Sequence, residues 1–232
     1  MAGGQRARAI GAVAALDDSV RSRLYAYVRR SGQAVTREQA ADAVGISRKL
    51  AAFHLDKLVV AGLLRSGTLG SRARQVGRAP KVYEPVVDAV QVSVPARTHD
   101  ELAAILIDAV VTQRPGENAA DARRRVAAEQ GRIAAGSVDR HEMRGRLGPE
   151  RALTLVESVL DDRGYEPYRP GAGCIRLRNC PFHPLAERAP ELVCGINEAF
   201  LGGLIDGLGA DPLKAVFAPA AQECCVEVRR RS

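Results

Sequence analysis

The sequence predicts an α+β fold in which a helix-rich N-terminal domain and a mixed C-terminal domain are joined by helices. Three observations predict it. Positive charge is concentrated at the start of the chain, where residues 1–82 carry 15 lysines and arginines against 5 aspartates and glutamates. Apolar residues recur three times at helical spacing before residue 62, and a glycine-punctuated basic stretch follows them. From residue 149 onward, helical and alternating patterns are interspersed.

The first three predicted helices lie between residues 17 and 62. Ser19 follows an acidic pair that can cap a helix start. Thr36 starts the second helix and Gly45 ends it, because a threonine oxygen satisfies free N–H groups and glycine adopts the left-handed conformation after a helix. Ser47 caps the third helix, whose apolar stripe consists of Ala51, Leu55 and Leu58. Two helices joined by such a tight turn form a helix-turn-helix, whose second helix enters the major groove of DNA.

The apolar stripe of the third helix leaves its other side free to meet DNA. Arg48 can read guanine edges or grip phosphate, while Ala52 and Phe53 offer apolar contact to thymine methyl groups. His54, beside the stripe, is interpreted as a packed or phosphate-touching residue. The candidate contacts of this helix are Ser47, Arg48, Lys49, Ala52 and Phe53.

Residues 65–85 predict a β-hairpin with a cationic tip, the wing of a winged helix. Glycines punctuate the stretch, and "KVYEP" at its end alternates like a strand. Its cations suit phosphates or a narrow minor groove, whereas a disordered basic linker is the alternative. The candidate contacts of the wing are Arg72, Arg74, Arg78 and Lys81. We therefore expect a winged helix-turn-helix DNA-binding domain at residues 1–90.

The stretches "ISRKLAAFHLDKLVVAGLL" and "GRAPKVYEP" resemble the winged-helix regulators grouped with the ArsR family. The resemblance covers about residues 16–86. It implies a transcriptional regulator that binds double-stranded DNA as a homodimer on a two-fold symmetric operator. Geometry agrees with this expectation, because one short reading helix seldom supplies enough base contacts alone.

Residues 91–140 are predicted to form a helical connector. The stretch 98–111 is strongly apolar and begins with the capping pattern of Thr98 and Glu101, and 117–136 is amphipathic. Helices in this position commonly form the dimer contact or carry a signal. An ordinary buried helix pair within the monomer is the alternative.

Residues 141–232 predict a small α+β sensor domain with an antiparallel sheet. Its expected elements are a helix from 149, a hairpin over 165–181, a buried helix over 191–209 and two late strands. No glycine-rich phosphate loop, zinc-protease motif or nucleophile elbow is present in the sequence.

Five cysteines occur in a chain that shows neither an export signal nor an apolar run of membrane-spanning length. We therefore expect a cytoplasmic protein in which thiols serve metal or redox chemistry, since stable disulfides are rare there. Cys180 ends a predicted strand, Cys194 lies in the next helix and Cys224 begins the last strand. Three thiols on separate elements suit zinc or an iron–sulfur cluster if they converge. Alternation along the strand favours Cys224 over Cys225 as the inward residue.

The stretch "NCPFHPLAERAPELVCGINEAFLGGLIDGLG" with the later "CCVEV" resembles the C-terminal half of SufR-type regulators, repressors that bind an iron–sulfur cluster through three cysteines. The match covers most of residues 149–228. It implies that Cys180, Cys194 and Cys224 hold an iron–sulfur cluster, of the four-iron type or another, that modulates operator binding. Zinc is the alternative metal, and the candidate fourth ligands are His183 and Cys225.

Two other functions remain open at this point. A metal-free regulator would sense a small apolar ligand, or thiol oxidation through a Cys180–Cys194 or a Cys224–Cys225 disulfide. A cysteine-dependent enzyme would pair Cys180 with His183, but nothing in the sequence orients that histidine or provides an oxyanion site. We therefore expect a regulator and not an enzyme.

Overall fold

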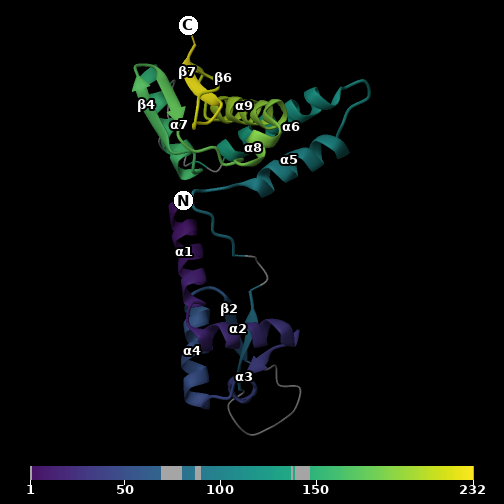
Figure 1. Cartoon of the computed structure of the whole chain (residues 1–232), viewed down its shortest axis with the longest axis vertical. Coiled ribbons are helices and arrows are strands. Elements are labelled where there is room, and N and C mark those ends of the chain that lie inside the picture. The colour runs from purple at the N-terminus through teal and green to yellow at the C-terminus, as the bar shows by residue number, and fades with distance from the viewer. Residues whose placement is uncertain (1, 69–79, 87–89, 137, 139–146, 232) are drawn as a thin grey trace. The chain divides into compact units, whose positions relative to one another are not determined.

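The structure is a computed structural model and describes residues 2–68, 80–86, 90–136, 138 and 147–231. The chain forms two compact units, Met1–Val92 and Ser93–Ser232, and each has its own hydrophobic core (Figure 1). The predicted α+β class, with a helix-turn-helix at the N-terminus and an antiparallel sheet near the C-terminus, is confirmed. No helix in the described part of the chain combines the length and the apolar composition that crossing a membrane requires.

In its described residues the first unit contains four helices, which pack around a small core, and a small sheet whose first strand lies between the second and third helices. Its antiparallel sheet has the strand order β1-β3-β2. Helix α1 and the short strand β1 were not predicted from the sequence. The elements are α1 (Ala2–Ala15), α2 (Ser19–Ser31), β1 (Val35–Thr36), α3 (Arg37–Val44), α4 (Arg48–Val60), β2 (Leu64–Thr68) and β3 (Lys81–Pro85).

Side-chain caps fix where the helices of this unit begin. The Asp18 carboxylate accepts a hydrogen bond from the backbone N–H of Arg21 at the start of α2. Thr36 and Gln39 form a reciprocal capping box at the start of α3. The hydroxyl of Ser47 accepts from the N–H of Leu50 at the start of α4. Each predicted start is therefore confirmed, and each depends on a hydrogen bond between residues only three positions apart in the sequence.

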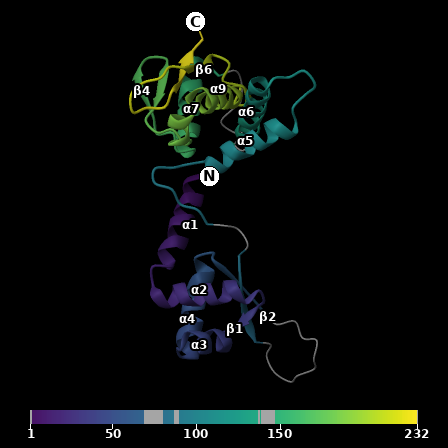
Figure 2. The same cartoon turned by 45° about the vertical axis from the view of Figure 1, so that its right-hand side comes forward.

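The second unit is an antiparallel sheet with the strand order β4-β5-β7-β6, packed with helices. Figures 1 and 2 both show α6 lying alongside α9. The elements are α5 (His99–Val111), α6 (Ala119–Ala135), α7 (Pro149–Asp162), β4 (Pro167–Gly171), β5 (Cys174–Leu177), α8 (Leu185–Arg188), α9 (Pro190–Gly207), β6 (Leu213–Phe217) and β7 (Val226–Arg230).

The helices expected in the connector, α5 and α6, belong to the core of the second unit. Ile105 of α5 and Ala127 of α6 are fully buried in the same cluster as Phe200 of α9. This arrangement corresponds to the buried pair that the sequence left open. The expected capping box at Thr98 is absent. The Thr98 side chain makes no capping hydrogen bond to the first turn of α5.

Helices α6 and α9 approach closely because glycines line their contact. A Cβ atom on Gly203 would lie 1.9 Å from the carbonyl oxygen of Ala128, and one on Gly131 would lie 2.1 Å from that of Phe200. Both obstacles are backbone atoms, which cannot rotate aside as a side chain can. The pairing of these helices therefore requires glycine at both positions.

We expect Gly203→Ala to destabilise the fold by about 1–3 kcal/mol or more, because the added methyl group forces the two helices apart. Gly202 is the matched control on the same helix, since a Cβ there meets nothing within 4 Å. Gly202→Ala should stabilise by up to about 1 kcal/mol through its higher helix propensity. Chemical denaturation of the full chain measures both changes. Equal effects of the two substitutions would contradict the close packing of α6 on α9.

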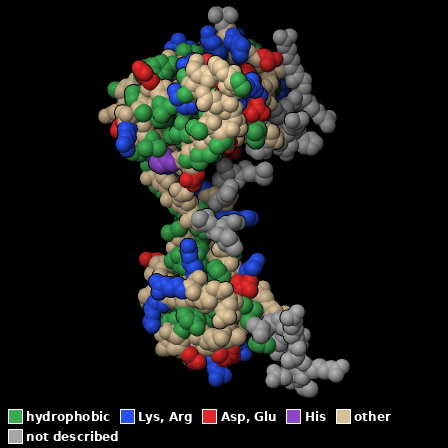
Figure 3. Space-filling view, turned by 90° about the vertical axis from the view of Figure 1, so that its right-hand side faces the viewer, with side chains coloured by type: hydrophobic (Ala, Val, Ile, Leu, Met, Phe, Trp, Pro, Cys, Tyr) green, Lys and Arg blue, Asp and Glu red, His purple; other side chains and the backbone are tan. Residues whose placement is uncertain are grey.

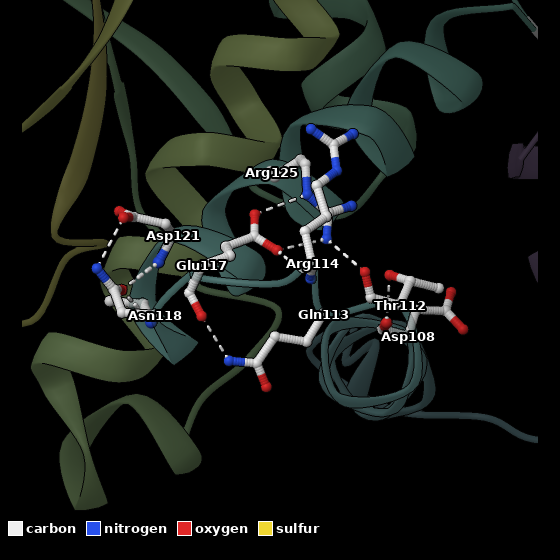
Figure 4. A network of polar contacts seen from close by, with 9 residues as sticks. Asp108, Thr112, Gln113, Arg114, Glu117, Asn118, Asp121 and Arg125 are labelled. Atoms are coloured by element: carbon white, nitrogen blue, oxygen red, sulfur yellow. Dashed lines mark hydrogen bonds and ion pairs between the residues drawn. The ribbon is translucent and has the colours of Figure 1, made fainter.

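The turn between α5 and α6 is held by Glu117, which lies at the centre of the polar network in Figure 4. Its carboxylate accepts hydrogen bonds from the Arg125 guanidinium at 2.8 Å and from the backbone N–H of Arg114 at 3.0 Å. The same guanidinium donates to the carbonyl oxygen of Thr112. Asn118 then caps α6 through the N–H groups of two following residues. The turn is thereby fixed to both helices.

The hydrogen bond from Arg125, followed by that from the Arg114 backbone, lowers the pKa of Glu117 to about 2 from its usual 4.5. A lowered folded-state pKa stabilises the fold above pH 4.5, and this contribution is lost as the pH falls towards 2. We expect Glu117→Gln to be less stable than the wild type at pH 7, by a margin that shrinks between pH 4.5 and 2. Thermal unfolding across this range measures the margin. Glu129→Gln, which removes an exposed carboxylate from α6, is the control and should show a smaller change at pH 7.

Candidate nucleic-acid interface and cysteine site

Helix α4 buries one side and exposes the other, as the sequence predicted. Ala51, Leu55 and Leu58 are completely buried in the core of the first unit. Arg48 and Lys49 are exposed in the first turn of the helix. In a helix-turn-helix the first residues of the reading helix contact base edges, so these two cations are placed where such contacts are made.

The other candidate DNA contacts on α4 differ in how accessible their side chains are. Phe53 is 54% exposed, whereas Ala52 is partly buried. Ser47 uses its oxygen to cap the helix, so its hydroxyl proton remains available to a phosphate. His54 is buried, with its Nδ1 atom 3.9 Å from a carboxylate oxygen of Asp18. This supports the interpretation of His54 as a packed residue.

Lys57 is a further exposed cation on α4 that was not predicted from the sequence. Its Nζ atom lies 5.7 Å from the centroid of the Phe53 ring, a cation–π contact. Lys49, Phe53 and Lys57 are four residues apart and therefore share one side of the helix. That spacing could have identified Lys57 from the sequence as a residue of the exposed side. The exposed surface of α4 thus carries cations along most of its length.

Lys81, expected to be a free cation of the wing, is paired with the reading helix instead. Its Nζ atom lies 2.6 Å from a carboxylate oxygen of Asp56 on α4, and the hydroxyl of Tyr83 donates to the same oxygen at 2.9 Å. Burial raises the pKa of Asp56, but these two hydrogen bonds outweigh it and lower the pKa. The pair fastens β3 to α4, and the role of Lys81 as a phosphate contact stays a prediction. Arg72, Arg74 and Arg78 lie outside the described residues.

Four of the five cysteines line one cavity of about 590 Å³ in the second unit: Cys180, Cys194, Cys224 and Cys225. They come from the loop after β5, from α9 and from the segment before β7. Cys180 was expected to end a strand, but β5 ends at Leu177, because the chain turns before a proline that cannot continue a ladder. Cys224 was expected to begin the last strand, but β7 begins at Val226.

Cys194 and Cys225 form a disulfide bond with their Cα atoms 6.3 Å apart. Neither of the two disulfides that the sequence left open, Cys180–Cys194 and Cys224–Cys225, is present. The expectation that alternation turns Cys225 away from the site was wrong. Alternation applies within a strand, whereas both residues precede β7, and this irregular segment directs both side chains to the cavity.

The other two sulfur atoms interact as thiols. A hydrogen bond from Cys224 lowers the pKa of Cys180 to about 7, against the opposing effect of burial. Donating that bond, together with burial, raises the pKa of Cys224. Asn197 also donates to the Cys224 sulfur at 3.2 Å, and the Tyr165 hydroxyl donates to the Asn197 oxygen at 2.7 Å. Cys180 is therefore the more readily ionised thiol of the pair.

His183 lines the same cavity, with its Nδ1 atom 3.6 Å from a carboxylate oxygen of Glu187. Cys174 lies in β5 opposite Arg229 and is not part of the cavity lining. Among the residues that the structure describes, no three His, Cys, Asp or Glu side chains lie close enough together to hold a metal ion. Two of the four sulfur atoms are bonded to each other, so reduction of the disulfide is required before Cys194 can serve as a ligand.

Residues 16–67 of the chain match a family model described as a helix-turn-helix domain, of the type found in ArsR-family regulators. The matched range begins just before α2 and ends in β2, and so contains the whole of α3 and α4. No curated protein and no solved structure matches the chain. The match and the exposed cations of α4 together support a DNA-binding transcription regulator.

Proposed function

We propose that this chain is a homodimeric transcription regulator whose cysteine cavity binds an iron–sulfur cluster, or zinc, and thereby modulates the binding of the winged helix to operator DNA. The observation that carries the proposal is the position of three cysteines from separate segments around one cavity. These are Cys180, Cys194 and Cys224. The resemblance of residues 149–228 to SufR-type regulators supports the same ligands.

The chemistry of the donor set fits such a group once the disulfide is reduced. Thiolates suit zinc and iron–sulfur clusters, and the lowered pKa of Cys180 favours its thiolate form near neutral pH. The Asn197 amide is placed to stabilise negative charge on the Cys224 sulfur. A fourth ligand is available from Cys225 or His183, which line the same cavity. A bound metal centre would supply a link between the loop after β5, α9 and the segment before β7.

Anaerobic purification under reducing conditions tests the proposal directly. We expect stoichiometric iron and sulfide with visible absorption, or stoichiometric zinc without it, and a different DNA affinity for the metal-free form in a gel-shift assay. Cys174→Ser is the matched control because it removes a thiol outside the cavity, and it should retain the metal. If the purified protein contains neither metal under these conditions, the proposed metal site is refuted. The proposal that the chain binds DNA would not be affected by that result.

The disulfide favours a second candidate, a metal-free thiol switch. Oxidation of Cys194 and Cys225 by a peroxide forms one S–S bond and reduces the peroxide to water or an alcohol. This function requires Cys225 and does not require Cys180, whereas the metal site requires Cys180. A DNA affinity that responds to peroxide in metal-free protein, and no longer does so in Cys225→Ser, would favour the switch.

A further inference from the structure

The exposed side of helix α5 is apolar from Ala103 to Val111. Ile107 is 61% exposed, Val110 is 74% exposed and Val111 is 71% exposed. Leu102, Ile105 and Ala109, on the opposite side of the helix, are buried in the core. Figure 3 shows exposed hydrophobic side chains, in green, on one face of the second unit. The exposed residues of the helix between its two ends are all apolar, and we call them the α5 stripe: Ala103, Ala104, Ile107, Val110 and Val111.

The stripe is symmetric about Ile107. At 100° per residue, its members lie within about 60° of the direction in which Ile107 points. Two α5 helices that cross antiparallel at Ile107 would bring Ala103 against Val111 and Ala104 against Val110. Small residues thus face branched ones on both sides of the centre. This is the self-complementary pattern that a two-fold interface requires.

Charge continues the same symmetry at the ends of the helix. Asp100 lies seven residues before Ile107, in the first turn of α5, and Arg114 lies seven residues after it, three positions beyond the last helical residue, Val111. An antiparallel pair would therefore bring each Asp100 to the end of the partner helix, where the other copy's Arg114 follows. Both residues are exposed, and within the described ranges neither side chain forms a hydrogen bond or ion pair, although the Arg114 charge helps to lower the pKa of Glu117. The network around Glu117 holds the backbone of Arg114 at the end of α5 (Figure 4).

We propose that the α5 stripe is the surface on which two copies of this chain associate, as an antiparallel α5 pair with its two-fold axis at Ile107. The proposal rests on the homodimer of the proposed function and assigns its contact surface. A partner of another kind would need an apolar surface but not this internal symmetry, and the paired opposite charges at both ends select a second copy.

The size of the stripe sets the expected strength of the dimer. Thirteen residues of helix extend for about 20 Å, and stable interfaces usually bury about 800 Å² on each partner. A single helix pair provides only part of that area. We therefore expect a dimer with a dissociation constant on the order of micromolar in the absence of DNA, since area and packing at this scale correspond to weak association.

Sedimentation equilibrium of the full chain tests the surface. We expect Ile107→Glu to raise the dimer dissociation constant at least 100-fold, because it places two carboxylates together on the axis. Ile133 on α6 is the matched control, being 60% exposed and outside the stripe. Ile133→Glu should leave the dissociation constant unchanged. Retained secondary structure in both variants shows that the fold is intact.

Charge reversal gives a second test that does not depend on packing. Asp100→Arg and Arg114→Glu should each weaken the dimer about tenfold, because each creates a like-charge contact twice in the symmetric pair. The double variant exchanges both charges and should restore wild-type association. A dimer unaffected by Ile107→Glu, or a double variant that fails to recover, would overturn the surface while the homodimer stands. A wild-type chain that stays monomeric at all concentrations, and on symmetric DNA, would overturn the homodimer itself.

Discussion

Cys194→Ser is expected to abolish both properties proposed for the cysteine cavity, metal binding and a response to peroxide. Cys194 belongs to the proposed set of three ligands and also forms the disulfide with Cys225. Serine is a poor ligand for soft metals and cannot form a disulfide bond. Metal analysis of anaerobically prepared protein and a peroxide titration followed by gel shift measure the two losses. We expect less than about a tenth of the wild-type metal content, since ligand loss removes much of the binding free energy.

Two neighbouring substitutions show which chemistry operates. Cys180→Ser should remove the metal and leave the disulfide able to form, while Cys225→Ser should remove the disulfide and leave three thiols in the cavity. Cys174→Ser, outside the cavity, should change neither property. Cys194 is almost fully buried, so circular dichroism must show that Cys194→Ser is folded. A folded Cys194→Ser protein that keeps its metal would exclude Cys194 as a ligand.

The N-terminal unit was predictable because its signals are local. The caps at Thr36 and Ser47 operate over three residues, and the stripe of α4 needs only the helical repeat. Helix α1 was missed because it buries only Ala12 among its described side chains and so shows no amphipathic repeat. The pairing of Lys81 with Asp56 was missed because it joins residues 25 positions apart. No local rule specifies which strand residue reaches which helix residue.

The sequence predicted that Cys180, Cys194 and Cys224 could converge, but not how the cysteines are bonded. Cys194 lies in the expected helix, whereas Cys180 follows β5 and Cys224 precedes β7, because the strands are shorter than their patterns predict. The bond between Cys194 and Cys225 depends on the path of the chain between β6 and β7, where no periodic pattern exists. The close contact at Gly203 could not be predicted from the sequence either. A glycine within a helix does not show which other helix packs against it until the fold is known.

Arg48→Ala is expected to weaken operator binding by about 5- to 150-fold, the range for loss of one bidentate contact to guanine. Arg48 is exposed in the first turn of α4, and the neighbouring stripe residues are buried, so the substitution should leave the fold intact. Because the operator must first be identified, we would select binding sites from a random duplex library with the wild-type chain. Fluorescence anisotropy on the selected site then gives the affinities. Arg30→Ala removes the same charge from the last turn of α2 and is the control.

The dependence of the Arg48 effect on sequence and salt separates its two possible contacts. If Arg48 reads a base, Arg48→Ala relaxes specificity at one position of the site and barely weakens binding to unrelated DNA. If it grips phosphate, binding weakens on all sequences and the slope of log K against log salt falls by about one. Equal affinities for Arg48→Ala, Arg30→Ala and the wild type would remove α4 as the reading helix. In that case the exposed cations of α4 would be a solvated surface, and the DNA contact would have to be made elsewhere on the chain.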